Sequence, residues 1–172
     1  MHKLIKLLFA GMLGLLMVTG LYAQNQEPAS PPKEASGKIG DAMITINYSS
    51  PGVKGRTIWG DLVPYDQVWR AGANEATKFK TDKDLMIEGQ ELQAGTYSLF
   101  LIPRENGPTT VIFNTVAEQW GSYNYDESKD ALRVDVEPAE NSMTERLEYS
   151  VGNDGIVIAW ENYKLPISVS VK

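Results

Sequence analysis

Residues of the types that recognise ligands are concentrated in one stretch, the central segment from Tyr48 to Phe79. Within 22 residues it contains Arg56, Trp59, Trp69, Arg70, Asn74, Glu75 and Thr77. An arginine guanidinium is a planar fork of donors that matches a carboxylate or a phosphate. A tryptophan presents a flat apolar face on which a sugar ring or a cation can stack. The pattern therefore indicates a candidate ligand-binding groove, in which the Asn, Glu and Thr side chains would hydrogen-bond hydroxyl groups.

The same residues have two other interpretations, which both involve the acids Asp61, Asp66 and Glu75. In a structural interpretation, Arg56 or Arg70 forms ion pairs with these acids, and the two tryptophans fill the core beneath the segment. In a catalytic interpretation, two of the acids serve as general acid and general base of a hydrolase, which requires carboxyl groups roughly 5–9 Å apart.

A second group of aromatic residues, Trp120, Tyr123 and Tyr125, lies in the sequence WGSYNYD, which is typical of a loop. Exposed aromatic side chains in a loop indicate a binding surface, whereas buried ones cap the core, and the sequence leaves both interpretations open. If the fold brings this loop beside the central segment, the two would line one cleft. The acids from Asp126 to Asp130 do not have the spacing of a calcium loop, so we predict no metal site.

The composition excludes several kinds of chemistry. The chain has no Cys and one His, His2, and its 16 basic and 22 acidic residues give a net charge of −6. Without an imidazole or a thiol after residue 2, Ser-His-Asp and Cys-His catalysis and zinc or copper sites are excluded. We expect no cofactor and no catalytic residues. The acidic balance also argues against nucleic acid as a partner.

The first residues, MHKLIKLLFAGMLGLLMVTGLYAQ, have the organisation of a secretory signal peptide. A basic start with Lys3 and Lys6 precedes an apolar run and a small residue, Ala23, at the expected cleavage site. We therefore predict a signal peptide over residues 1–23 and export to the periplasm or the medium, with no transmembrane segment in the mature chain. Cleavage would leave 14 basic and 22 acidic residues, a net charge of −8. The Pro-rich, polar residues 24–37 predict a flexible linker, and residues 38–172 a single domain.

The domain has the sequence pattern of an all-β protein. Short runs with the alternation or the apolar content of strands recur along it, with turn residues between them. The runs are 43–48, 75–81, 85–87, 96–102, 109–113, 131–136, 144–151, 156–160 and 167–171, and residues 91–95 and 153–155 are expected to be turns. No convincing amphipathic helix is present, so we predict one antiparallel β-sandwich or jelly roll.

Four stretches of the chain resemble one family of exported bacterial proteins, the DUF2911 family. They are SPGVKGRTIWGDLVPYDQVWRAGANEAT, LQAGTYSLFLIP, VIFN and WGSYNYDESKDALRV. The resemblance extends over roughly residues 38–171 and implies a secreted, β-rich protein from a Bacteroidetes-type host. The function of the family is unknown, so the resemblance implies no catalytic residues.

These observations favour a non-catalytic binding module for a glycan, a peptide or another small ligand, rather than an enzyme. The candidate binding residues are Arg56, Trp59, Trp69, Arg70, Asn74, Glu75, Trp120, Tyr123 and Tyr125. The alternative is a structural or protein-interaction domain of the cell envelope, and a carboxylate-dependent hydrolase is a third hypothesis. The sequence leaves the oligomeric state open.

Overall fold

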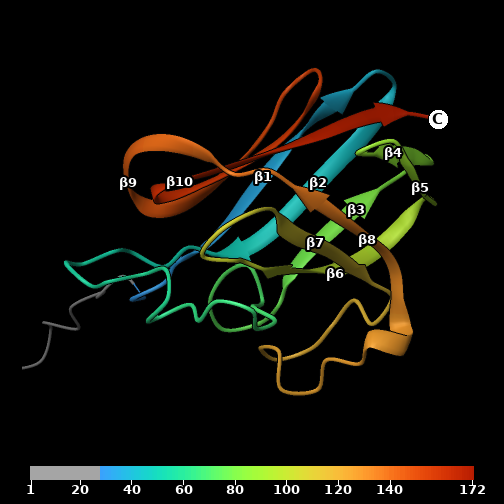
Figure 1. The fold of residues 1–172 in the computed structure, drawn as a ribbon. Coiled ribbons are helices and arrows are strands. Elements are labelled where there is room, and N and C mark those ends of the chain that lie inside the picture. Colours follow the sequence, from blue (N-terminus) through green and yellow to red (C-terminus); the bar gives the residue numbers. More distant parts are fainter. Residues whose placement is uncertain (1–27) are drawn as a thin grey trace, which may run out of the picture.

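Two antiparallel sheets form the protein, and the computed structural model describes residues 28–172 (Figure 1). Six strands in the order β1-β2-β3-β6-β7-β8 form the larger sheet, and four in the order β5-β4-β10-β9 form the smaller one. The strands of the larger sheet are β1 (Pro32–Ile39), β2 (Ala42–Ser49), β3 (Thr77–Thr81), β6 (Gly95–Ile102), β7 (Thr109–Asn114) and β8 (Asp130–Val136). Those of the smaller sheet are β4 (Leu85–Ile87), β5 (Gln90–Leu92), β9 (Ala139–Val151) and β10 (Gly155–Val171), and one 3₁₀ turn, η1, covers Glu127–Lys129. The predicted all-β sandwich is confirmed.

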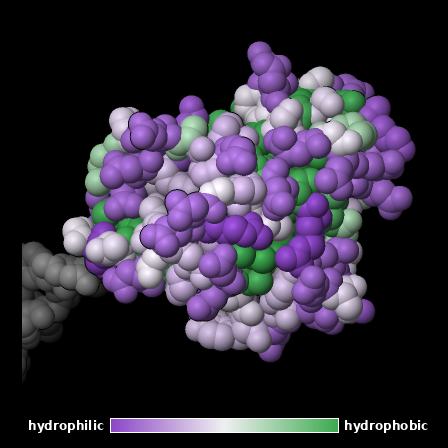
Figure 2. All heavy atoms as spheres, in the orientation of Figure 1, coloured by the Kyte–Doolittle hydropathy of each residue, from purple (hydrophilic) through white to green (hydrophobic). Residues whose placement is uncertain are grey.

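Alternating side chains of the strands make the core between the sheets. In β2, Ile44 and Ile46 are fully buried between the exposed Met43 and Asn47, the period of two that the sequence shows. Phe79 of β3 and Phe113 of β7 meet edge to face at 5.0 Å within this core. Polar residues cover most of the face in Figure 2, and hydrophobic atoms show only in separate patches.

Strands β6 and β7 are buried on both faces, unlike the rest of the larger sheet. A second, smaller apolar cluster, centred on Phe100 and Ile112, packs with Ala76, Val68 and Tyr125. These last three residues belong to the central segment and the second aromatic loop, so both loops cover the sheet here. This explains why TYSLFLI is apolar without alternation.

The predicted linker over residues 24–37 is too long. Strand β1 begins at Pro32 and pairs with β2 over its whole length, from Pro32 opposite Ser49 to Ile39 opposite Ala42. Most β1 side chains are exposed, because β1 is the edge strand of the larger sheet, and its polar composition resembles that of a tether. The predicted signal peptide lies outside the described residues.

Strand β10 combines two of the predicted strands, because the chain bends back within it. Thirteen extended residues span roughly 40 Å, yet Gly155 lies against the Ile167 carbonyl and the Val169 amide donates to the Asp154 carbonyl at 3.1 Å. The bend coincides with register shifts around Glu161, whose φ is 55°. Figure 1 shows β9 and β10 curling together at this place. Residues 91–95 were expected to be a turn, but Glu91 and Leu92 belong to the short strand β5 (Gln90–Leu92).

Candidate functional site

The central segment is fixed at one end of the sandwich by backbone hydrogen bonds to both sheets. Its first part bonds to β9: the Val53 amide donates to the Glu145 carbonyl at 2.7 Å, and the Leu147 amide to the Pro51 carbonyl at 3.0 Å. Further along, Trp69 and Leu101 of β6 exchange two amide–carbonyl bonds of 2.8 and 2.9 Å. The segment is therefore part of the scaffold, with its loop side chains held in place.

Two candidate tryptophans of this segment belong mainly to the core. Trp59 and Trp69 are half-buried, and their rings contact each other edge to face at 5.7 Å. Trp160 of β10, only 1% exposed, stacks on Trp69 at 5.7 Å and meets Trp59 edge to face at 5.9 Å. Tyr163 completes the group against Trp59 at 4.3 Å. This part of the structural interpretation is confirmed.

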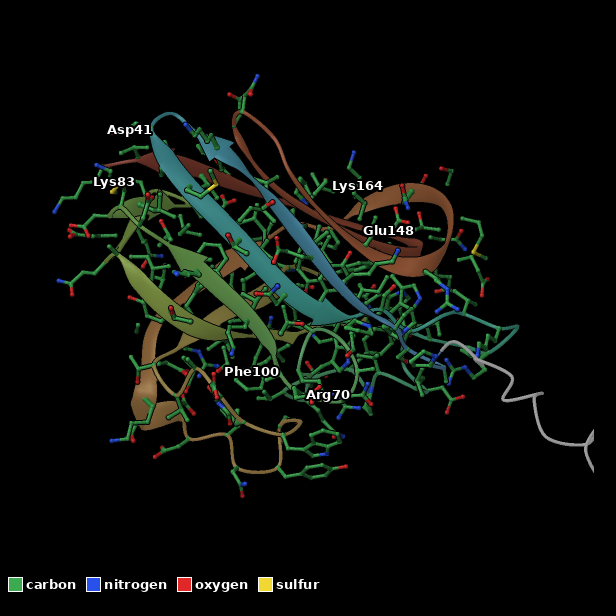
Figure 3. All side chains as sticks on the ribbon, turned by 180° about the vertical axis from the view of Figure 1, so that it is seen from behind. Asp41, Arg70, Lys83, Phe100, Glu148 and Lys164 are labelled. Atoms are coloured by element: carbon green, nitrogen blue, oxygen red, sulfur yellow. The ribbon has the colours of Figure 1, made fainter. Side chains whose placement is uncertain are left out.

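The two candidate arginines do not form the ion pairs that the structural interpretation requires. Arg56 instead donates to the chain itself, from Nη2 to the Gly52 carbonyl at 2.6 Å and from Nε to the Val53 carbonyl at 3.2 Å. Among residues 28–172, the side chain of Arg70 has neither an ion pair nor a hydrogen bond, and its Nε is buried without an acceptor. Figure 3 shows Arg70 at the end of the molecule opposite Asp41 and Lys83.

The second aromatic loop lies directly beside the central segment, an arrangement that the sequence left open. The Ala76 amide donates to the Gln119 carbonyl at 3.0 Å, and the Gly121 amide to the Asn74 carbonyl at 3.1 Å. Between these two hydrogen bonds, Glu75 and Trp120 lie opposite each other as a non-hydrogen-bonded pair of an antiparallel β-bridge. Side chains in such a pair project to the same face and are closest together. Glu75 and Trp120 are thus directly opposite each other where the two loops meet.

Trp120 and Tyr123 form an exposed aromatic pair at this end of the molecule. Their exposed fractions are 58% and 80%. Gly121, between them, has a φ of +64°, and a Cβ there would lie 3.0 Å from the Tyr123 ring and 3.2 Å from Nη1 of Arg70. The Arg70 guanidinium therefore approaches the loop backbone between the two aromatic residues. Asn74, another of the candidate residues, donates a hydrogen bond from Nδ2 to Ser49 Oγ at 3.2 Å.

Tyr125 has a different environment from the other two aromatic residues of its loop. Its ring packs edge to face on Phe100 at 5.1 Å, and its hydroxyl donates to Asp130 Oδ2 at 2.5 Å. Burial, and then the hydrogen bond to Asp130, raise the pKa of Tyr125 well above its usual value. The carboxylate of Asp130, 6% exposed, also meets Arg133 at 3.3 Å. Tyr125 therefore caps the second apolar cluster, the one centred on Phe100 and Ile112. This is the core-capping interpretation of the loop.

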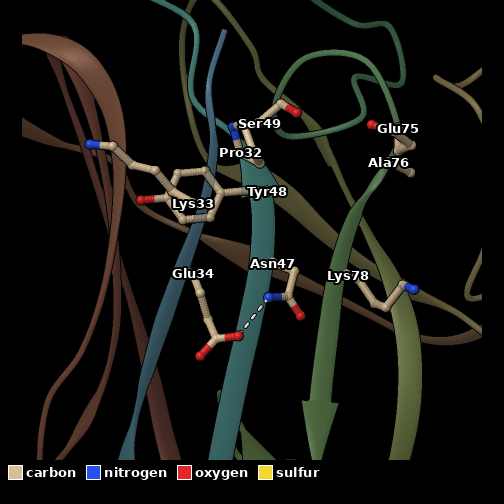
Figure 4. A pocket seen from close by; sticks show the side chains of 9 residues that line it. All are labelled: Pro32, Lys33, Glu34, Asn47, Tyr48, Ser49, Glu75, Ala76 and Lys78. Atoms are coloured by element: carbon tan, nitrogen blue, oxygen red, sulfur yellow. Dashed lines mark hydrogen bonds between the residues drawn. The ribbon is translucent and has the colours of Figure 1, made fainter. Parts of the chain in front are cut away.

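A polar groove that the sequence did not indicate crosses the outer face of β1, β2 and β3. It measures about 450 Å³, and Glu34, Asn47 and Lys78 lie side by side on these three strands (Figure 4). Asn47 Nδ2 donates to Glu34 Oε2 at 2.9 Å. Glu75 also lines the groove, and because Glu75 lies opposite Trp120, the groove reaches the second aromatic loop. The sequence gives no sign of this groove, because β1 has the composition of a linker.

The three acids that the hydrolase hypothesis requires all lie on the surface. Asp61, Asp66 and Glu75 are all exposed, and Asp66 lies 3.9 Å from Arg104. Within residues 28–172, no three acidic side chains gather as metal ligands would. The same residues include no helix of the length and apolarity that crossing a bilayer requires.

Exposure of the four tryptophans differs enough to be tested directly. We expect Trp120→Phe to remove most of the emission that iodide quenches and to shift the remaining spectrum to the blue, because the other three indoles pack in the core. The free energy of unfolding should change by no more than about 0.5 kcal/mol, as at other surface positions. Iodide quenching that is unchanged in Trp120→Phe would show that this indole is covered.

The fold and the site together define a two-sheet β-sandwich with an exposed aromatic pair at one end, beside an arginine that has no partner among residues 28–172. Residues 30–169 match the family described as DUF2911, protein of unknown function, and the chain belongs to this family. The resemblance inferred from the central segment is therefore confirmed. No curated protein and no solved structure matches the chain.

Proposed function

We propose that this protein is a non-catalytic binding module whose ligand is a glycan. The observation that carries the proposal is the aromatic pair Trp120 and Tyr123, exposed on a loop that backbone hydrogen bonds hold to the central segment. Aromatic faces of this kind cover the apolar face of a sugar ring. Because the loop is fixed before binding, little ordering entropy opposes association.

The polar groove is a second feature that fits a glycan. Its side chains Glu34, Asn47 and Lys78 are donors and acceptors that match sugar hydroxyl groups, and Glu75 connects it to Trp120. The signal-peptide pattern of residues 1–23 supports an exported protein that meets its ligand in the periplasm or outside the cell.

The test is a titration of the purified protein with soluble neutral oligosaccharides and with peptides, followed by intrinsic fluorescence. We expect saturable binding of an oligosaccharide that Trp120→Ala weakens by about tenfold or more, taking as a guide the roughly 1–3 kcal/mol that an aromatic side chain contributes when a nucleobase stacks on it. Tyr123→Ala should weaken it as well.

Met143→Ala is the matched control, because Met143 is a 59% exposed apolar residue on β9, outside both the groove and the aromatic pair. It should bind like the unmodified protein. Peptide binding without oligosaccharide binding would contradict the glycan assignment. Equal affinity in Trp120→Ala, Tyr123→Ala and Met143→Ala would contradict the site.

A further inference from the structure

A small cavity at the same end of the sandwich has two cationic side chains in its wall. Its volume is about 150 Å³, and it is lined by Arg56, Arg70, Trp69, Trp160, Leu62 and Pro51, among others. One water occupies about 30 Å³ of liquid volume, so the cavity has room for a group of a few heavy atoms. Its apolar walls come from the central segment and from β10.

Among residues 28–172, no acidic residue lines this cavity, although the chain has a net charge of −6. Three other surface pockets combine both charges. The polar groove pairs Lys33 and Lys78 with acids, and the pocket at Lys83 contains Asp82 and Asp84. Two arginines in the wall of a largely apolar cavity, without a carboxylate beside them, make the site locally positive.

Both arginines keep donors free for a ligand. A guanidinium has five N–H donors, and Arg56 uses Nε and Nη2 on the Gly52 and Val53 carbonyls, which fixes its orientation. Arg70 has no acceptor among the described residues, and its buried Nε is unpaired. The terminal Nη1 and Nη2 groups of Arg70 are therefore the donors available to an acceptor in the cavity.

We propose that this cavity binds a carboxylate group, held by Arg56 and Arg70 and flanked by the indoles of Trp69 and Trp160. A carboxylate is planar and accepts the paired donors of a guanidinium. The planar acid group and its short stem also suit a cavity of about 150 Å³ with flat aromatic walls. The proposal rests on the cavity alone and does not require the aromatic pair at Trp120 and Tyr123.

The experiment is an NMR titration of the full mature chain with acetate, pyruvate, glucuronate, glucuronate methyl ester and inorganic phosphate. The arginine Nε–H signals and the four indole signals are followed. We expect the Arg70 signal and those of Trp69 and Trp160 to shift saturably with acetate or pyruvate if the source is a small free acid. A response to glucuronate alone would identify a sugar acid as the source.

Arg70→Gln should weaken carboxylate binding by about tenfold or more, the effect of losing a charge-assisted hydrogen-bonded pair. Arg56→Gln should have a similar effect. If loss of the two hydrogen bonds from Arg56 to the Gly52 and Val53 carbonyls unfolds that variant, Arg56→Lys takes its place in the test. Arg104→Gln is the matched control, since Arg104 lies near Asp66 and Asp135 and outside the cavity. It should leave binding unchanged.

Three results would overturn the proposal: equal shifts with glucuronate and its methyl ester, tighter binding of phosphate than of every carboxylate, or no saturable shift with any of the carboxylates. Unchanged affinity in a folded Arg70→Gln variant would do the same. The aromatic-pair variant Trp120→Ala should retain carboxylate binding. Its failure to bind a neutral oligosaccharide therefore tests the proposed function separately.

Discussion

Replacing Trp160 by alanine is expected to lower the free energy of unfolding by about 3–5 kcal/mol, the cost of removing a large buried aromatic side chain. Trp160 is 1% exposed, and it contacts both Trp69 and Trp59. These contacts join β10 to the central segment, so the cavity left behind lies where the two meet. For a domain of this size, the melting temperature should fall by roughly 6–20 °C.

Urea unfolding followed by far-UV circular dichroism measures this change without depending on indole emission. Trp120→Ala provides the control, because the same residue type is 58% exposed there and its loss should change the free energy of unfolding by at most about 0.5 kcal/mol. A loss below about 1 kcal/mol in Trp160→Ala would show that the aromatic cluster does not hold the central segment in place.

Stability is expected to fall steeply above pH 10 because of buried tyrosines, and most clearly because of Tyr149. Burial raises the pKa of Tyr149 far above its ordinary value, and its hydroxyl donates to the Ala71 carbonyl at 2.6 Å. The unfolded chain releases this proton near pH 10. The stabilisation is therefore complete below pH 10 and is lost between pH 10 and the raised folded pKa, at about 1.4 kcal/mol per pH unit for this one group.

Tyr149→Phe isolates the contribution. The free energy of unfolding of the variant should decline less steeply between pH 10 and 11, by about 1.4 kcal/mol per pH unit. At pH 7 the variant should be less stable by about 1 kcal/mol, because Thr77 Oγ1 still donates to the Ala71 carbonyl at 2.9 Å. Urea titrations at several pH values measure both quantities. If the free energies of unfolding of the two proteins fall in parallel above pH 10, the assignment to Tyr149 is contradicted.

The sequence predicted the fold where the signal was local. The alternation around Ile44 and Ile46, the apolar run 96–102 and the turn at residues 153–155 each match an element of the structure. The sequence failed where tertiary contacts decide. Strand β1 has the composition of a tether and becomes a strand because β2 offers its edge, and β10 is one element whose return at Glu161 has no strong local signal.

The candidate site was predictable in its residue types and its neighbourhood, but not in the partners of each side chain. Local sequence shows that arginines and acids are close, which suggested ion pairs, yet Arg56 bonds to two carbonyls and Arg70 to no described residue. Burial of Trp59 against Trp160 depends on strands about 100 residues apart, so the sequence could not separate it from the exposed Trp120. The groove at Glu34 and Asn47 required β1 to be recognised first.

The measurement that tests the central claim most directly is a ¹⁵N NMR titration of the four indole N–H signals with the oligosaccharide that binds best. The Trp120 signal is assigned as the one missing from Trp120→Phe. If the exposed aromatic pair is the ligand platform, the Trp120 signal moves saturably, and the signals of the buried Trp59 and Trp160 move little. If the Trp120 signal stays in place while the oligosaccharide binds, or if no oligosaccharide moves any indole signal, the glycan platform at this end of the sandwich does not exist.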